Sequence, residues 1–328
     1  MRKILAAFAL AAAAACAYSQ VQMSQFASAF KDFASDMAGS LAVSSTMGAD
    51  WSDAYIGGFP HLGLGVTVGG TAVNSGVSSK LFSSMGAEAP SFVSQVGIPI
   101  PAAVATFKIG VPFIPVDLGF KIGFLPPSVD KSLLGSSDGN LKYMNWGLQA
   151  RYALIKQSPG LKPNVSVGLA FNHIDGSVTV PTGMSSQTYD LDGYYITADS
   201  PTMDLSWQSN TVDITAQISK KLLIFVPYAG AGLTLGKASV TGGVDSDITT
   251  NYPGGVSALK NYLEELGYSV PDYMTPSGFS YTENEVAPLF RVYGGMSFRI
   301  VILDLDLQAL YLPQTKSVGA SFTGRLQF

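Results

Sequence analysis

The stretch Val116–Phe124, "VDLGFKIGF", shows most clearly the pattern from which the fold of this chain is predicted. Apolar and polar or small side chains alternate along it, with Val116, Leu118, Phe120, Ile122 and Phe124 on one face and Asp117, Gly119, Lys121 and Gly123 on the other. A period of two is that of a β-strand with one apolar and one polar face. About ten residues is also the length that a tilted strand needs to cross a bilayer. The stretch predicts a membrane-spanning strand.

The same alternation recurs along most of the chain, for example in "MNWGLQARYAL" from Met144 and in "VILDLDLQALY" from Val301. We expect strands at 62–73, 101–110, 116–124, 144–154, 165–173, 177–183, 204–219, 223–240, 287–299, 301–311 and 317–328. Asp175-Gly176 is interpreted as a two-residue turn. Bacterial barrels have an even number of strands, so a count of eleven predicted strands means that one of them is false or that one strand was missed. We expect about twelve, with ten to fourteen open, and place the missing strand at Ser91–Gly97.

Composition agrees with a membrane protein built of strands. The chain is 47% hydrophobic and 13% charged, whereas about a quarter of residues are charged in soluble domains. After the first seventeen residues no run of about eighteen apolar residues occurs. Since only helices and closed barrels satisfy every backbone group in lipid, the fold class expected is an all-β, transmembrane, antiparallel up-and-down barrel over 50–328.

The first seventeen residues have the pattern of a secretory signal peptide, with Arg2 and Lys3 before the apolar run Ile4–Ala15. Cleavage is expected after Ala17, which would remove Cys16, the one cysteine of the chain. The alternative is that Cys16 is a lipidated first residue. The remaining chain is mildly acidic, so nucleic acid is not expected as a partner.

Residues 18–48 precede the barrel and contain a short amphipathic helix. Phe26, Phe30, Phe33 and Met37 recur there at helical spacing. One interpretation is a periplasmic or interfacial helix ahead of the first strand. The other is a plug inserted into the lumen, with these four residues on its packing face.

Candidate functional residues are the charges on the polar faces of the predicted strands. We expect the following to line the lumen: Asp117, Lys121, Arg151, Arg291, Asp304, Asp306 and Arg325. The chain has only two histidines, His61 and His173, and keeps no cysteine after cleavage, so neither a zinc site nor a catalytic thiol is expected. We therefore expect no metal, no cofactor and no enzymatic activity. His173 is assigned to the membrane interface at a periplasmic turn. An interfacial girdle is expected from Trp51, Tyr143, Trp146, Tyr152, Trp207, Tyr228, Tyr293 and Tyr311.

These features together resemble an outer-membrane β-barrel of a diderm bacterium. The resemblance rests on the signal peptide, the alternating strands and the terminal "ASFTGRLQF". It implies that Phe322, Leu326 and Phe328 form the signal read by the barrel-assembly machinery, and that outer-membrane lipids surround the barrel. The block Gly97–Pro126 more distantly resembles uncharacterised barrels related to long-chain fatty-acid transporters.

Two functions are compatible with this sequence. The first is a channel or transporter for passive uptake of a small solute, with an apolar solute favoured. The second is a structural or surface-binding barrel that acts through its long external loops, 184–202 and 241–286.

Overall fold

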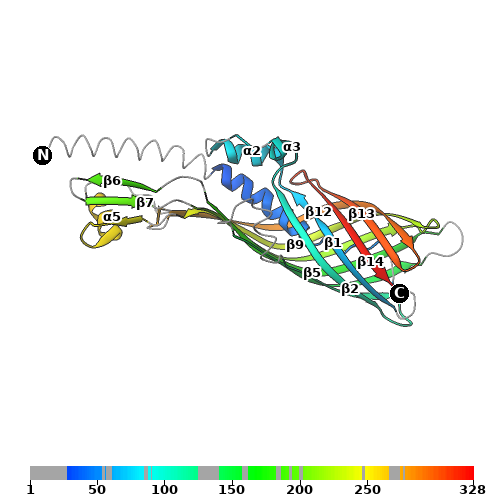
Figure 1. The fold of residues 1–328 in the computed structure, drawn as a ribbon. Helices are drawn as coiled ribbons and strands as arrows, with labels where there is room; N and C mark the ends of the chain where they lie inside the picture. The colour runs from blue at the N-terminus through cyan, green and yellow to red at the C-terminus, as the bar shows by residue number, and fades with distance from the viewer. Residues whose placement is uncertain are drawn as a thin grey trace.

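The computed structural model describes residues 28–53, 56, 61–84, 88–89, 91–124, 140–156, 162–181, 186–191, 194–198, 202–245, 248–265, 274–275 and 278–328. Within them, ten antiparallel strands close into a barrel (Figure 1). Its strands are β1 (Leu62–Ala72), β2 (Pro99–Gly110), β3 (Val116–Phe124), β4 (Asn140–Ile155), β5 (Asn164–Pro181), β8 (Thr202–Ser219), β9 (Phe225–Asp245), β12 (Gly278–Ile300), β13 (Leu303–Leu312) and β14 (Ser317–Gln327). The ring closes where β14 pairs with β1, with Phe322 opposite Val68.

Ten strands lie within the expected range of ten to fourteen, and the number is below twelve because one predicted turn was wrong. β5 runs straight through Asp175 and Gly176, which pair with Gln208 and Trp207 of β8. A Cβ on Gly176 would lie 2.6 Å from the Trp207 ring, so this glycine makes room for an inward tryptophan. Segments 165–173 and 177–183 are therefore one strand. The strand expected at Ser91–Gly97 was also wrong, because Ser91–Val96 forms the short helix α3.

With ten strands, the connections sort into two ends of the barrel. We call the turn end the one with the tight connections 111–115, 220–224 and 301–302, where Phe328 also lies. There the Phe328 amide donates to the Leu62 carbonyl over 2.8 Å. The loop end carries the long connections. Short turns at one end and long loops at the other are typical of bacterial membrane barrels, in which the short turns face the periplasm.

The strands present apolar side chains outward and polar side chains inward. Exposed residues on the outer face include Leu64, Val66, Phe120, Leu169 and Leu307. On β4, β5, β8 and β9 the apolar belt ends toward the loop end. A row of paired residues across these strands follows it: Trp146, His173, Asn210 and Lys237. An apolar outer band around a polar interior is the arrangement of a membrane barrel. No helix among the described residues is long and apolar enough to span a membrane.

Several aromatic residues and His173 lie elsewhere than expected. Tyr152 and Tyr311 are exposed on the outer face. In contrast, five residues assigned to the girdle are buried inside the barrel: Trp51, Tyr143, Trp207, Tyr228 and Tyr293. Their rings pack inside the barrel and do not contact lipid headgroups. His173 lies within β5 and not at a periplasmic turn. Its Nδ1 atom is 2.8 Å from Oδ1 of Asn210 on the neighbouring strand β8.

Smaller elements lie beyond the loop end of the barrel (Figure 1). A three-stranded sheet consists of β6 (Gln187–Leu191), β7 (Tyr194–Ala198) and β10 (Ile248–Thr250), with helix α5 (Gly255–Glu265) nearby. The connection from β1 to β2 carries α2 (Ser75–Ser84) and α3. The short strand β11 (Met274–Thr275) pairs with the start of β12.

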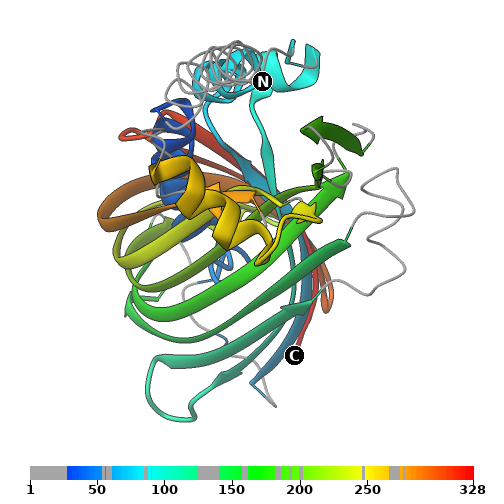
Figure 2. The same ribbon diagram turned by 90° about the vertical axis from the view of Figure 1, so that its left-hand side faces the viewer.

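The N-terminal helix, residues 28–44, lies within the ring of strands at the loop end (Figure 2). Phe30, Phe33, Met37 and Leu41 are buried on it. They form an apolar cluster with inward residues of the barrel: Ile100, Leu141, Tyr143, Ile174, Trp207, Ala238 and Val240. Each such side chain gains about 1.5–3 kcal/mol on burial. The helix is therefore held by apolar packing.

Candidate functional site

The chain continues from the N-terminal helix through the lumen before it enters β1. We call residues 28–56 the plug, of which 28–53 and 56 are described. The helix ends in successive turns, with the Ser45 amide donating to the Leu41 carbonyl and the Ala49 amide to the Thr46 carbonyl. At Gly48, with φ of 80°, a Cβ would lie 2.6 Å from Val104 of β2. Glycine is needed here for the left-handed backbone and for the close approach to the wall.

Asp50 of the plug joins a buried ion group on the wall. Arg291 of β12 donates from Nη1 to Asp50 Oδ2 over 2.8 Å and from Nη2 to Asp213 Oδ2 of β8 over 2.7 Å. All three side chains are buried, and Arg291 also lies over the Tyr293 ring, 4.6 Å from its centre. One wall arginine thus bridges a plug carboxylate and a wall carboxylate.

Asp53 of the plug forms a second group toward the turn end. Its carboxylate pairs with Arg299 of β12 and lies 3.3 Å from Arg325 of β14. Both arginines also reach Asp304 of β13. Burial alone would raise the pKa of the Asp53 carboxyl, but the charges of Arg325 and Arg299 outweigh it and hold the pKa below its ordinary value. Asp53 therefore stays ionised at neutral pH.

Arg151 of β4 holds the backbone of the plug next to Asp53. Its Nη1 donates to the Asp53 carbonyl over 2.7 Å and to the Trp51 carbonyl over 3.0 Å. Its Nη2 donates to Asp117 Oδ2 of β3 over 2.5 Å. The other oxygen of Asp117 accepts from the Ile56 amide over 2.9 Å. The Arg151–Asp117 pair thus anchors the plug by its main chain.

Two wall lysines donate hydrogen bonds to carbonyl oxygens of the plug. Lys108 of β2 donates to the Ala49 carbonyl over 2.5 Å, and its ammonium lies 4.8 Å from the Trp51 ring centre. Lys121 of β3 donates to the Ser45 carbonyl and, over 3.0 Å, to the Met47 carbonyl. No carboxylate among the described residues forms an ion pair with either lysine.

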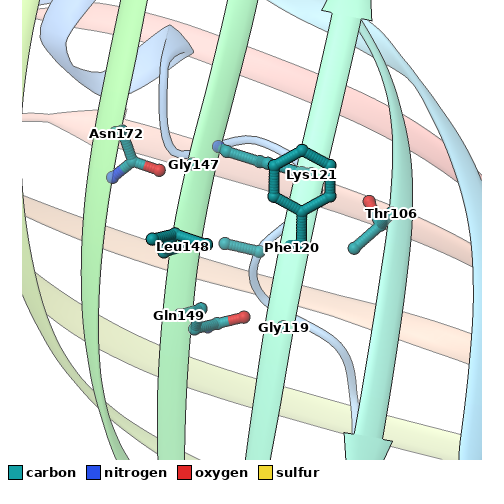
Figure 3. A pocket seen from close by; sticks show the side chains of 9 residues that line it. Thr106, Gly119, Phe120, Lys121, Gly147, Leu148, Gln149 and Asn172 are labelled. Carbon is teal, nitrogen blue, oxygen red and sulfur yellow. The ribbon is translucent and has the colours of Figure 1, made fainter.

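A small cavity lies between the plug and the wall. A cavity of about 10 Å³ next to Lys121 and Ala49 is roughly the room for one water molecule. Figure 3 shows its wall, where the Lys121 side chain crosses from β3 toward Gly147 on β4. A Cβ on Gly147 would lie 2.8 Å from Lys121 Cε. The glycine therefore leaves the path of the lysine stem open.

The seven predicted lumen residues all point into the barrel and are buried. Six of them belong to the contacts described above. The seventh, Asp306, accepts from the Tyr228 hydroxyl over 2.8 Å and from the Ser297 hydroxyl. Of the predicted plug residues, Phe30, Phe33 and Met37 face the apolar cluster, whereas Phe26 lies outside the described residues. Phe322, Leu326 and Phe328 are exposed on the outer face.

Five ionic residues of this site were not singled out from the sequence: Asp50, Asp53, Lys108, Asp213 and Arg299. The alternation that gave Lys121 also contains Lys108 and Asp213, since both occupy polar positions within expected strands. Asp50 and Asp53 lie in no periodic segment, and nothing local distinguishes them from solvated loop residues.

Comparison with known proteins gives no match to a protein-family model and none to a curated protein. Among solved structures, the translocator domain of the autotransporter NalP from Neisseria meningitidis is 8% identical, with 90% of this chain and 99% of that chain covered and a TM-score of 0.33. The toluene transporter TbuX from Ralstonia pickettii is 10% identical, with 81% and 89% covered and a TM-score of 0.27. LpxR from Salmonella typhimurium is 9% identical, with 81% and 100% covered and a TM-score of 0.25.

These likenesses are too remote to carry a functional argument. The closed sheet with its apolar outer belt and polar interior identifies the architecture on its own: the chain is an outer-membrane β-barrel.

Proposed function

We propose that this protein is a passive channel for a small solute, held closed by its own plug. The observation that carries the proposal is that the described plug residues, 28–53 and 56, occupy the lumen without contributing a strand to the sheet. The ten strands pair with one another all around the ring. Displacing the plug would therefore open the lumen without breaking any pairing between strands.

The wall also has internal partners for most of its charges. If the plug leaves, Arg291 keeps Asp213, Arg151 keeps Asp117, and Arg325 keeps Asp304. Charged pairs that face water carry little desolvation penalty and are each worth only about 0–1 kcal/mol. Such a wall suits a lumen that becomes water-filled.

The closed state is the resting state in this proposal. Release of the plug separates buried charge-assisted hydrogen bonds, which are stronger than neutral ones. Asp50 and Asp53 both make such bonds, and the helix adds its apolar cluster. Opening would need a bound solute, a partner or a change in the membrane to offset these contacts.

The apolar solute favoured by the sequence would meet apolar wall at the loop end, where the cluster around Phe30 lies. Nearer the turn end the wall carries charges. Any solute that crosses the whole lumen must pass them, so the charged level determines which solutes get through.

A reversible lock on the plug tests the proposal. The hydroxyls of Ser52 and Ser297 are 2.8 Å apart, and those of Ser40 and Ser317 are 2.9 Å apart. We would introduce each pair as cysteines in a Cys16→Ser chain and record planar-bilayer conductance in both redox states. Under an applied voltage, which serves as the change in the membrane that drives opening, the reduced proteins are expected to open and the oxidised ones to stay silent.

The matched controls are the four single-cysteine variants, which cannot form the lock and should conduct in both redox states. Equal conductance of locked and reduced double variants would show that the plug is not the gate. Silence of every variant under all voltages tested would overturn the channel itself.

A second candidate function is a surface-binding barrel. It is favoured by the elements beyond the loop end, where Tyr194, Tyr195 and Tyr262 are each exposed by 41% or more. Tyr252 contacts both Tyr194 and Tyr262, at ring distances of 5.3 and 5.9 Å. Exposed tyrosines are common anchors in binding surfaces. Replacing the three exposed residues with serine should abolish adhesion to host-cell surfaces, whereas Tyr311→Ser on the lipid-facing wall should not.

A further inference from the structure

We infer that the solute admitted by this lumen is a small anion, one that carries a carboxylate or phosphate group. The inference rests on the proposed channel function and adds the chemical class of the solute. It follows from the balance of charge between the plug and the wall.

The described wall at the level of residues 45–56 is basic. Its cations are Lys108, Lys121, Arg151, Arg291, Arg299 and Arg325, and its carboxylates are Asp117, Asp213, Asp304 and Asp306. Six formal positive charges thus face four negative ones. At this level of the lumen the plug contributes two carboxylates, Asp50 and Asp53, and these restore the balance. When the plug leaves, the wall keeps an excess of two positive charges.

The contacts made by the plug have the chemistry of an anionic ligand. Arg291 binds the Asp50 carboxylate, and Arg299 with Arg325 binds that of Asp53. Planar guanidinium groups are suited to carboxylate and phosphate recognition. The plug therefore holds the place that a carboxylate or phosphate of a solute would take.

The two lysines provide a further part of the site. Lys108 and Lys121 lie on the adjacent strands β2 and β3. In the pairing of these strands Thr106 is opposite Lys121, and Lys108 is opposite Gly119. Their bonds to plug carbonyls are lost when the plug leaves, and no wall carboxylate in the described structure pairs with them. In a water-filled lumen these ammonium groups are charged and face the path of the solute.

Glycines shape the wall around these lysines. A Cβ on Gly119 would lie 3.3 Å from Lys108 Cγ, and one on Gly147 would lie 2.8 Å from Lys121 Cε. Both lysine stems therefore pass over backbone that lacks side chains, which keeps them close to the wall. A basic ring in a passage with low-dielectric walls concentrates anions and repels cations.

The experiment measures the reversal potential of the full chain in a tenfold gradient of potassium chloride. If wild-type openings are rare, the full-length Asp50→Asn/Asp53→Asn variant supplies a loosened plug. We expect chloride to permeate roughly tenfold better than potassium. Acetate and inorganic phosphate, added in turn, should reduce the chloride current, and their half-blocking concentrations distinguish carboxylate from phosphate preference.

Three variant pairs complete the test. Lys108→Gln/Lys121→Gln should lower the chloride preference to near unity, and Lys108→Arg/Lys121→Arg should retain it. Lys142→Gln/Lys237→Gln, which removes two exposed lysines of the outer face, should leave it unchanged.

The outcomes separate the inference from the proposed function. A conducting protein that prefers potassium, or that shows no preference, overturns the anion inference and leaves the channel standing. A chloride preference that survives Lys108→Gln/Lys121→Gln also overturns it as a property of this wall. Silence of the wild type and of the loosened variant overturns both proposals.

Discussion

The carboxylate of Asp53 makes the binding of the plug to the wall depend on pH. Arg325 and Arg299 hold the Asp53 pKa below its ordinary value, so the folded state binds its proton less tightly than an unfolded chain does. The stabilisation it gives is full above a pH of about 4 and is lost as the pH falls through the lowered pKa. We predict that plug release, measured as channel opening in bilayers, rises below about pH 4.

The matched variant is Asp53→Asn, which lacks the titrating group. It should open more often than wild type at neutral pH and should show a smaller further rise on acidification. An identical acid response in the two proteins would contradict the role assigned to Asp53, because the remaining carboxylates would then account for all of it.

At this scale the sequence predicted the wall better than the plug. Asp117, Lys121 and Arg151 could be found because strand alternation determines the face on which a side chain lies. Asp50 and Asp53 could not be found, because their role depends on partners more than two hundred residues away in the chain, such as Arg291 and Arg299. Pairings over that distance follow from barrel closure and not from local pattern.

The N-terminal helix is the element that closes the loop-end half of the lumen. Phe33 is 1% exposed within its apolar cluster, and truncating a buried phenylalanine costs about 3–5 kcal/mol. We predict that Phe33→Ala speeds hydrogen exchange of amides in residues 28–44 while strand amides keep their protection. Lys31→Ala, on the exposed side of the helix, is the control that should change neither.

The elements show where local signals fail. The helix was expected from its stripe of Phe30, Phe33 and Met37, but that stripe fits a periplasmic face and a plug equally well. The Asp175-Gly176 turn was wrong because the same dipeptide that favours a hairpin also gives the space that Trp207 needs. A turn at this position reverses the apparent direction of the strands that precede it.

At the scale of the whole molecule, the barrel and the plug form two distinct layers. The sheet closes through the β1–β14 pairing, which begins at Gly63 and Gln327, after the plug has ended. Closure removes free strand edges and leaves every strand paired on both sides. The barrel should therefore be able to form without the plug.

This leads to a prediction for a chain that lacks residues 28–53. We expect it to refold in detergent with the β-sheet circular dichroism of the full chain. Its thermal midpoint should be lower, because the apolar cluster and the pairs of Asp50 and Asp53 are lost. Deleting β1 instead should prevent refolding, since both β2 and β14 would lose a partner. If removal of the plug also prevents refolding, the plug is part of the core that the barrel needs to fold, and an open lumen could not be a stable state of this protein.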